Sequence, residues 1–192
     1  MEPPAPPSPR PLSRTIILCG PSSSGKTTLA KALQETLLPA VWLAFSVDSI
    51  VYSLPDSVLE RCNHANDWAG VDGHALFAGA LGCVRALTAN GNSVIFDAVV
   101  TSGAAAGQLI AETADANPFV VALTCPWSEL KRRTLARGDR TIGEAAFSFN
   151  HAAGHLRYHL EINTAHLAPQ EAAAALIEEF QAWNEAGCPR LL

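Results

Sequence analysis

The sequence lacks the features of several protein classes. Of its 192 residues, 13 are Lys or Arg and 18 are Asp or Glu, which gives a net charge of −5. This balance argues against a general nucleic-acid-binding protein, which would need a basic face. No apolar run approaches the length that spans a membrane, and the N-terminus carries no apolar core of a signal peptide. We therefore expect a cytoplasmic protein with neither nucleic acid nor a membrane as its partner.

The chain also lacks a disulfide or metal-binding pattern. Its five cysteines are scattered, odd in number and without C-x-x-C spacing, which indicates reduced thiols. Cys19 and Cys125 are interpreted as small apolar residues at strand ends. His151, His155 and His159 recur every fourth residue, but the central Glu of a zinc metalloprotease motif is missing. A packed or solvated helix face is therefore favoured over a metal site.

The first residues differ in composition from the rest of the chain. Residues 1–13 contain a proline-rich run, and proline denies this segment helix and ladder hydrogen bonds. We expect an extended or disordered tail there. Residues 14–192 show no internal repeat and no second domain, and a chain of this length buries a substantial core. We expect them to form a single domain.

Residues 20–27 spell G-x-x-x-x-G-K-T, the pattern of a phosphate-binding P-loop. Apolar, β-branched residues 15–19 predict a buried strand before this loop. Leucines at helical spacing in residues 26–38 predict a helix after it. The motif therefore stands between a strand and a helix, which is the context that it requires.

This loop predicts a nucleoside triphosphate site that takes ATP and Mg²⁺. Its glycines allow successive backbone N–H groups to surround a phosphate, beside a helix N-terminus that favours negative charge. Lys26 would reach the β- and γ-phosphates, and the Thr27 hydroxyl would be a Mg²⁺ ligand. The loop residues assigned to the nucleotide are Gly20, Pro21, Ser22, Ser23, Ser24, Gly25, Lys26, Thr27 and Thr28.

Strands and helices are predicted to alternate along the chain. Continuous apolar strands that alternate with helices indicate an α/β fold, here a P-loop kinase-like parallel sheet of about five strands flanked by helices. Residues 54–73 are predicted to be polar and irregular. The further strands are expected at 41–47, 93–97, 119–123 and, weakly, 158–163, and the further helices at 74–90, 103–117, 127–136, 144–157 and from 169 onward.

Two aspartates lie where predicted strands end, at the edge where α/β sheets bind ligands. Asp48 would orient an acceptor hydroxyl and accept its proton, or else merely cap a helix that begins at Ser49. Asp97 is similar to a Walker-B carboxylate that holds Mg²⁺ through water, with a turn-starting Asp as the alternative. We assign Thr27 and Asp97 to the metal.

A basic stretch predicts an Arg-containing lid. The stretch comprises Arg132, Arg133, Arg137 and Arg140. Residues 137–140, Arg-Gly-Asp-Arg, leave the predicted helix and enter a Gly-containing loop, where guanidinium groups would close over the γ-phosphate. The alternative is an exposed basic helix end, where cations are favoured anyway. We assign Arg133 to the nucleotide, and we assign Arg137 and Arg140 to catalysis together with Asp48 and Lys26.

The acceptor pocket is expected beside the predicted catalytic aspartate. Trp68 lies in a polar segment near this position, whereas the other tryptophans are interpreted as core residues. The residues assigned to the acceptor are Phe45, Val47, Asp48, Ser49, Trp68 and Asp97.

With these elements in place, the chain resembles the chloramphenicol 3-O-phosphotransferase family of small P-loop kinases. Order and spacing agree from Thr15 to Phe180. The shared features are the P-loop, residues 42–49, the strand that ends in Asp97, residues 136–140, and Tyr158-x-x-Glu161-x-Asn163-Thr164-x-His166.

The resemblance implies an ATP-dependent kinase that phosphorylates an antibiotic hydroxyl and so confers resistance. The family's catalytic aspartate falls on Asp48, and its lid arginines fall on Arg137 and Arg140. The family pairs two aspartates after the third strand, whereas Ala98 occupies the second position here, and residues 54–73 match poorly. The acceptor is therefore chloramphenicol or a different natural product.

Two other functions stay open. The same fold supports a kinase for an ordinary metabolite, such as a sugar acid or a nucleoside. The other function is a nucleotide-dependent switch or ATPase that acts on a protein. The positions of Asp48 and Arg140 argue against this function, because a switch needs no acceptor base.

Overall fold

The computed structural model describes residues 14–189 apart from residues 66, 139–140 and 153. The expected proline-rich tail and Arg140 lie outside the described residues. The strands form a five-stranded sheet in the order β2-β3-β1-β4-β5, and every neighbouring pair is parallel. The predicted parallel α/β sheet is confirmed. Its strands are β1 (Thr15–Cys19), β2 (Trp42–Ser46), β3 (Ser93–Ala98), β4 (Phe119–Thr124) and β5 (Leu160–Asn163).

The central strand, β1, is buried on both faces. Ile16 and Leu18 belong to one hydrophobic cluster, and Ile17 and Cys19 belong to the other, as the two-residue period of a strand requires. Burial raises the pKa of the Cys19 thiol to about 12, so this cysteine stays protonated, as expected for a small apolar residue. The P-loop therefore begins directly after a strand that is buried in the core.

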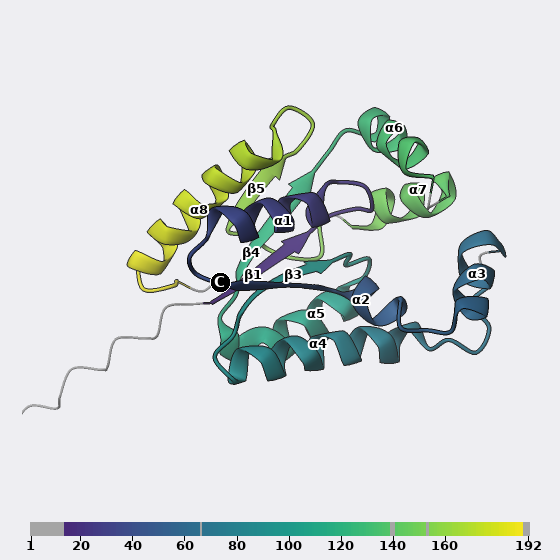
Figure 1. The fold of residues 1–192 in the computed structure, drawn as a ribbon, viewed down its shortest axis with the longest axis horizontal. Coiled ribbons are helices and arrows are strands. Elements are labelled where there is room, and N and C mark those ends of the chain that lie inside the picture. Colours follow the sequence, from purple (N-terminus) through teal and green to yellow (C-terminus); the bar gives the residue numbers. More distant parts are fainter. Residues whose placement is uncertain (1–13, 66, 139–140, 153, 190–192) are drawn as a thin grey trace, which may run out of the picture.

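Two layers of helices cover the sheet (Figure 1). On one face α1 and α8 pack together, and Leu33 of α1 and Leu176 of α8 are fully buried against the sheet. On the other face, α4 and α5 contribute Leu81 and Leu109 to the second cluster. These helices span Lys26–Thr36 (α1), Gly73–Ala89 (α4), Gly103–Thr113 (α5) and Pro169–Glu185 (α8), and η1 (Ala114–Ala116) extends α5 by one 3₁₀ turn.

The remaining helices gather at the carboxyl ends of the strands (Figure 1). There α2, α6 and α7 lie around the loop between β1 and α1, whereas α3 projects to the side. In the described part of the chain, none of the helices combines the length and apolar character that a bilayer crossing requires. The bounds are Val47–Val51 (α2), Asp56–Ala65 (α3), Trp127–Arg137 (α6) and Ile142–His151 (α7).

The segment predicted to be irregular, residues 54–73, contains the helix α3. The carbonyl of Pro55 accepts hydrogen bonds from the N–H groups of Val58 and Leu59, which starts the first turn. Cys62, which is buried, follows Leu59 by three residues and Val58 by four, so the three side chains share one helix face. This apolar stripe is too narrow to stand out in a polar sequence, and the prediction of an irregular segment was wrong over these residues.

The second predicted strand ends earlier than expected because Ser46 caps a helix. The Ser46 hydroxyl accepts from the N–H of Ser49, and the Ser49 hydroxyl accepts from the N–H of Ser46, which is a reciprocal capping box. Val47 therefore begins α2, and Asp48 lies in its first turn. The alternative in which Asp48 caps a helix at Ser49 was wrong.

The three regularly spaced histidines do not share a helix face. The helix α7 ends at His151, and Nδ1 of His159 accepts a hydrogen bond from the N–H of Val120, at 2.9 Å. Burial lowers the pKa of His159, which favours the neutral ring that this bond needs. The spacing therefore reflects a helix end and a strand edge.

Candidate active site

A cavity of about 660 Å³ lies at the carboxyl edge of the sheet. The P-loop, the first turns of α2, α4 and α5, the end of β3, and helices α6 and α7 all contribute residues to its wall. This is the edge at which parallel α/β sheets bind ligands. The volume suits a small organic molecule together with part of a nucleotide.

The P-loop presents the N-terminus of α1 to this cavity. Gly25, the N-cap of α1, has φ of 94°, a left-handed conformation that glycine adopts without strain. No side chain caps this helix end. The N–H of Ser22 instead donates to Oγ of Ser148 on α7, at 3.0 Å. An uncapped helix N-terminus beside a left-handed glycine is a favourable place for a phosphate.

Lys26, Thr27 and Asp97 form a connected polar group on the cavity wall. Nζ of Lys26 donates to the carbonyl of Pro21 at 2.9 Å and lies 3.6 Å from Oδ1 of Asp97. The Thr27 hydroxyl donates to Oδ2 of Asp97 at 2.8 Å. The Lys26 side chain is 6% exposed, so its charge is balanced by a nearby carboxylate in a largely buried setting.

The Thr27 and Asp97 oxygens fit a magnesium ion. Hydroxyl and carboxylate oxygens are hard ligands, and Mg²⁺ in phosphoryl-transfer sites takes few protein ligands and completes its shell with phosphate and water. The described residues hold no group of three or more His, Cys, Asp or Glu that could cage a metal. An ion at this place would therefore be shared with a phosphate.

Asp48 lines the same cavity from the first turn of α2. The capping box at Ser46 turns the chain directly after β2, so the side chains of Val47 and Asp48 reach the cavity wall. Lys26, Thr27 and Asp97 line it from β3 and α1. A carboxylate thus shares one cavity with the phosphate-binding residues.

Arg137 is the final residue of α6 and also lines the cavity. Gly138 follows it with φ of 71° and ends the helix in the left-handed conformation. The remainder of the expected lid, including Arg140, lies outside the described residues.

The structure brings many of the predicted site residues together at this cavity. The predicted residues that line it are Ser22, Ser23, Gly25, Lys26, Thr27, Thr28, Val47, Asp48, Asp97 and Arg137.

Other predicted residues lie outside the cavity wall, each for a physical reason. Gly20 packs against β4, where an added Cβ would lie 2.5 Å from the carbonyl oxygen of Leu123. Ser24 is fully buried. Phe45 stacks on Phe96, with ring centroids 6.2 Å apart. Four more predicted residues lie outside it. The carbonyl of Pro21 accepts a hydrogen bond from Lys26, and Ser49 belongs to the capping box. Trp68 lies in the turn before α4, and Arg133 lies beside Thr164.

Sequence reasoning missed most of the cavity wall outside the P-loop. Two of the missed residues, Glu144 and Ser148, come from α7, and most of the others come from α4, α5 and the segment after β3. That segment follows a strand directly, so the rule that places ligands at strand ends could have drawn attention to it. The missed residues include His74, Phe77, Thr101, Ser102, Gln108, Glu144 and Ser148.

Comparison with known proteins agrees with this geometry. Residues 13–181 match the family model of the chloramphenicol phosphotransferase-like proteins. The chain belongs to this family. As a family member it is a P-loop phosphotransferase that binds a nucleotide and acts on a small molecule. No protein in the curated set of sequences matches it significantly.

Solved structures share the fold at low sequence identity. The APS kinase of Mycobacterium tuberculosis, solved with AMPPNP and APS, is 18% identical with a TM-score of 0.66, covering 89% of this chain and 99% of that one. The tunicamycin resistance protein of Deinococcus radiodurans is 17% identical with a TM-score of 0.58, covering 86% and 95%. Shikimate kinase from Acinetobacter baumannii is 17% identical with a TM-score of 0.56, covering 89% and 94%. The fold of this family member is therefore that of the P-loop kinases.

Proposed function

We propose that this protein transfers the γ-phosphate of ATP to a hydroxyl of a small, uncharged natural product, such as chloramphenicol or another antibiotic, and so confers resistance. The observation that carries the proposal is the position of Asp48 on the wall of the cavity that Lys26, Thr27 and Asp97 also line. Donor phosphate and acceptor alcohol would meet between these residues.

In the proposed reaction the acceptor oxygen forms a bond to the γ-phosphorus, and the bond from this phosphorus to the β–γ bridging oxygen breaks. Asp48 orients the hydroxyl and takes its proton. Lys26 and Arg137 balance the charge on the phosphate oxygens. Thr27 and Asp97 would hold Mg²⁺, which supplies further neutralisation of phosphate charge when it is bound.

The charge of the acceptor side supports an uncharged acceptor. The residues of α4, α5 and the segment after β3 that line the cavity include no Lys or Arg. Carboxylated or phosphorylated acceptors are normally bound by such cations, with Arg the usual partner. Thr101, Ser102 and Gln108 instead offer neutral donors and acceptors, and Phe77 offers an apolar surface.

An acceptor screen tests the proposal. The purified protein is incubated with ATP, Mg²⁺ and one acceptor at a time, and the product is read as the mass gain of one phosphoryl group. We expect gain on hydroxyl-bearing neutral antibiotics, with chloramphenicol and tunicamycin in the first panel, and reduced sensitivity of bacteria that express the protein. Phosphorylation confined to gluconate, shikimate or nucleosides would show a metabolite kinase instead. Hydrolysis stimulated only by a protein would show a switch.

A further inference from the structure

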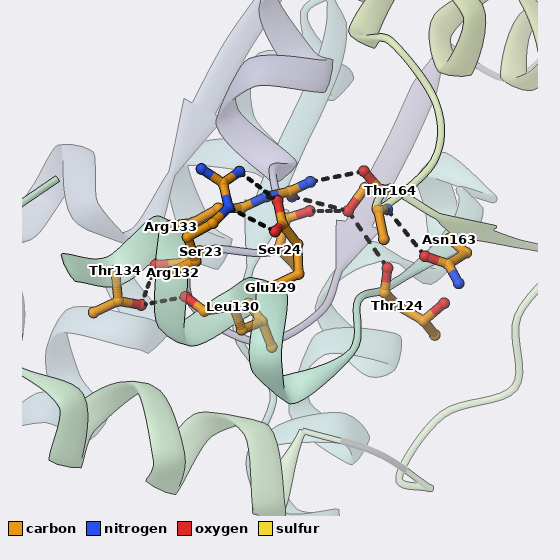
Figure 2. Close-up of polar contacts among 11 residues, drawn as sticks. Ser23, Ser24, Thr124, Glu129, Leu130, Arg132, Arg133, Thr134, Asn163 and Thr164 are labelled. Carbon is orange, nitrogen blue, oxygen red and sulfur yellow. Dashed lines mark hydrogen bonds and ion pairs between the residues drawn. The ribbon is translucent and has the colours of Figure 1, made fainter. Parts of the chain in front are cut away.

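A polar network behind the P-loop connects it to two elements distant in sequence (Figure 2). The hydroxyl of Thr164, the residue after β5, donates to the carbonyl of Ser24 at 2.7 Å. Arg133 of α6 donates from Nη1 to this hydroxyl at 3.2 Å and from Nη2 to the Thr164 carbonyl at 2.8 Å. These bonds join residues separated by 31 and 140 positions in the chain.

The chemistry of the three groups fixes the direction of these bonds. A threonine hydroxyl has one hydrogen and two acceptor lone pairs, whereas a guanidinium only donates. Because Arg133 donates to the Thr164 hydroxyl, the hydrogen of that hydroxyl is left for a carbonyl oxygen. The Ser24 carbonyl at 2.7 Å is nearer than the Thr124 carbonyl at 3.4 Å and is the main acceptor. The guanidinium also lies 3.5 Å from the place that a Cβ on Gly25 would occupy. The contact therefore falls on the peptide at which the loop becomes helix α1.

Arg133 is itself held in place. Its Nε donates to Oε1 of Glu129, one turn earlier on α6, at 2.8 Å. Hydrogen bonds from Arg132 and then Arg133 lower the pKa of Glu129 to about 2, so the carboxylate is ionised. The Arg133 side chain is 25% exposed, whereas that of Arg132, which binds the same carboxylate from outside, is 69% exposed. The two neighbouring arginines thus share a partner but differ in their contact with the loop.

We propose that Arg133 and Thr164 are positioning residues that clamp the Ser24–Gly25 peptide and so hold the P-loop in its phosphate-binding shape. The clamp acts through the loop backbone, and neither residue lines the cavity. This inference rests on the nucleotide-binding part of the proposed function and is independent of the acceptor. The expectation that Arg133 contacts the nucleotide directly is the alternative that the test must separate.

The test measures phosphate and nucleotide affinity without any acceptor. Isothermal titration gives the affinity of the wild type, Thr164→Val and Arg133→Lys for tripolyphosphate and for AMPPNP, both with Mg²⁺. We expect both variants to weaken both ligands by the same factor, about tenfold, because each removes hydrogen bonds to the loop. Arg132→Lys is the matched control, since it alters the same Glu129 pair without touching Thr164, and it should stay within about twofold of wild type. Because no acceptor is present, the result does not depend on which acceptor the enzyme uses.

Two further variants make the outcome decisive. Thr164→Ser keeps the hydroxyl and should restore affinity, which a general folding defect would not allow. The double variant Arg133→Lys with Thr164→Val should lose no more than either single variant, because one clamp is broken in each case. Undiminished tripolyphosphate affinity in folded Thr164→Val would overturn the proposal. An Arg133→Lys variant with weaker affinity for AMPPNP but unchanged affinity for tripolyphosphate would also overturn it, because Arg133 would then contact the adenine base of the nucleotide. A wild type that binds neither ligand would refute nucleotide binding itself.

Discussion

The two halves of the cavity differ in charge and in the way they are held. The phosphate half, Ser22 to Thr28 with Asp97, consists of backbone groups and the side chains of Lys26, Thr27 and Asp97. Hydrogen bonds from other elements hold it in place. The acceptor half, formed by residues of α4, α5 and the segment after β3, is lined without Lys or Arg. It is held by the apolar packing of α4 and α5 on the sheet. In the proposed reaction, the loop backbone with Lys26, Thr27 and Asp97 would bind the phosphates, and the side chains of the other half would bind the acceptor.

This difference separates what the fold constrains from what it leaves variable. A backbone cradle requires residues that permit its conformation, such as Gly25 with φ of 94°, so substitutions in the phosphate half disturb the loop itself. A side chain on the cavity-facing side of a helix, such as Gln108 of α5, can change without altering the sheet or its core. The acceptor half is therefore where specificity can diverge among proteins that share the reaction.

The largest expected effect comes from the carboxylate between the two halves. Asp48→Asn removes the proton acceptor, so kcat should fall by about a hundredfold to ten-thousandfold while AMPPNP affinity is unchanged. Asp56→Asn is the matched control, because Asp56 likewise lies in the first turn of a helix, α3, and both substitutions lose the same favourable helix-dipole interaction. Steady-state kinetics and isothermal titration measure the two quantities. Near-normal turnover in Asp48→Asn would remove this residue from the mechanism.

The phosphate half should respond next most strongly, and in binding. Lys26→Met keeps the length of the side chain but removes the charge beside Asp97, so nucleotide affinity should fall by about thirtyfold or more. Lys31→Met, one turn and a half further along α1 on its exposed face, should leave affinity unchanged. Titration with AMPPNP measures both variants. Equal affinities for the two would show that the buried lysine does not face the phosphates.

The close packing of Gly20, the first residue of the P-loop, against β4 can be tested by substitution. In Gly20→Ala the new Cβ would lie 2.5 Å from the Leu123 carbonyl oxygen, so β1 and β4 must move apart, and we expect a loss of about 1–3 kcal/mol in the free energy of unfolding. Gly107→Ala in the middle of α5 meets no atom within 4 Å and should instead stabilise by roughly 0.5–1 kcal/mol. Urea unfolding curves give both values. Shifts of opposite sign in the two variants would confirm that close approach, and not glycine content, sets the requirement.

The same division explains how much the sequence could predict. The P-loop motif, the strand before it and Asp97 were found because each has a local pattern, and the parallel sheet was found because its strands are continuous apolar runs. Trp68 was assigned to the acceptor by its place in the sequence, yet its turn lies before α4 and outside the cavity wall. His74 and Gln108 were missed because only the packing of α4 against α5 brings them to one wall. Tertiary contacts of that kind leave no local pattern.

The smallest expected effect is that of a substitution in the acceptor half. It tests most directly whether the two halves of the cavity recognise different ligands. Gln108→Leu keeps the size of the side chain but removes its hydrogen-bonding groups from the cavity wall. Loss of one such bond should raise the KM for the acceptor by about twofold to tenfold, with AMPPNP affinity unchanged. Gln181→Leu on the exposed side of α8 is the matched control and should change neither quantity.

If Gln108→Leu weakened nucleotide binding as much as acceptor binding, the two halves would not be separate recognition surfaces. A change confined to the acceptor would instead make this wall the place to alter specificity. Gln108 lines the cavity, whereas Ala106 and Leu109 of the same helix are buried in the core, so substitution of Gln108 leaves that packing intact. The measured change can then be attributed to recognition of the acceptor.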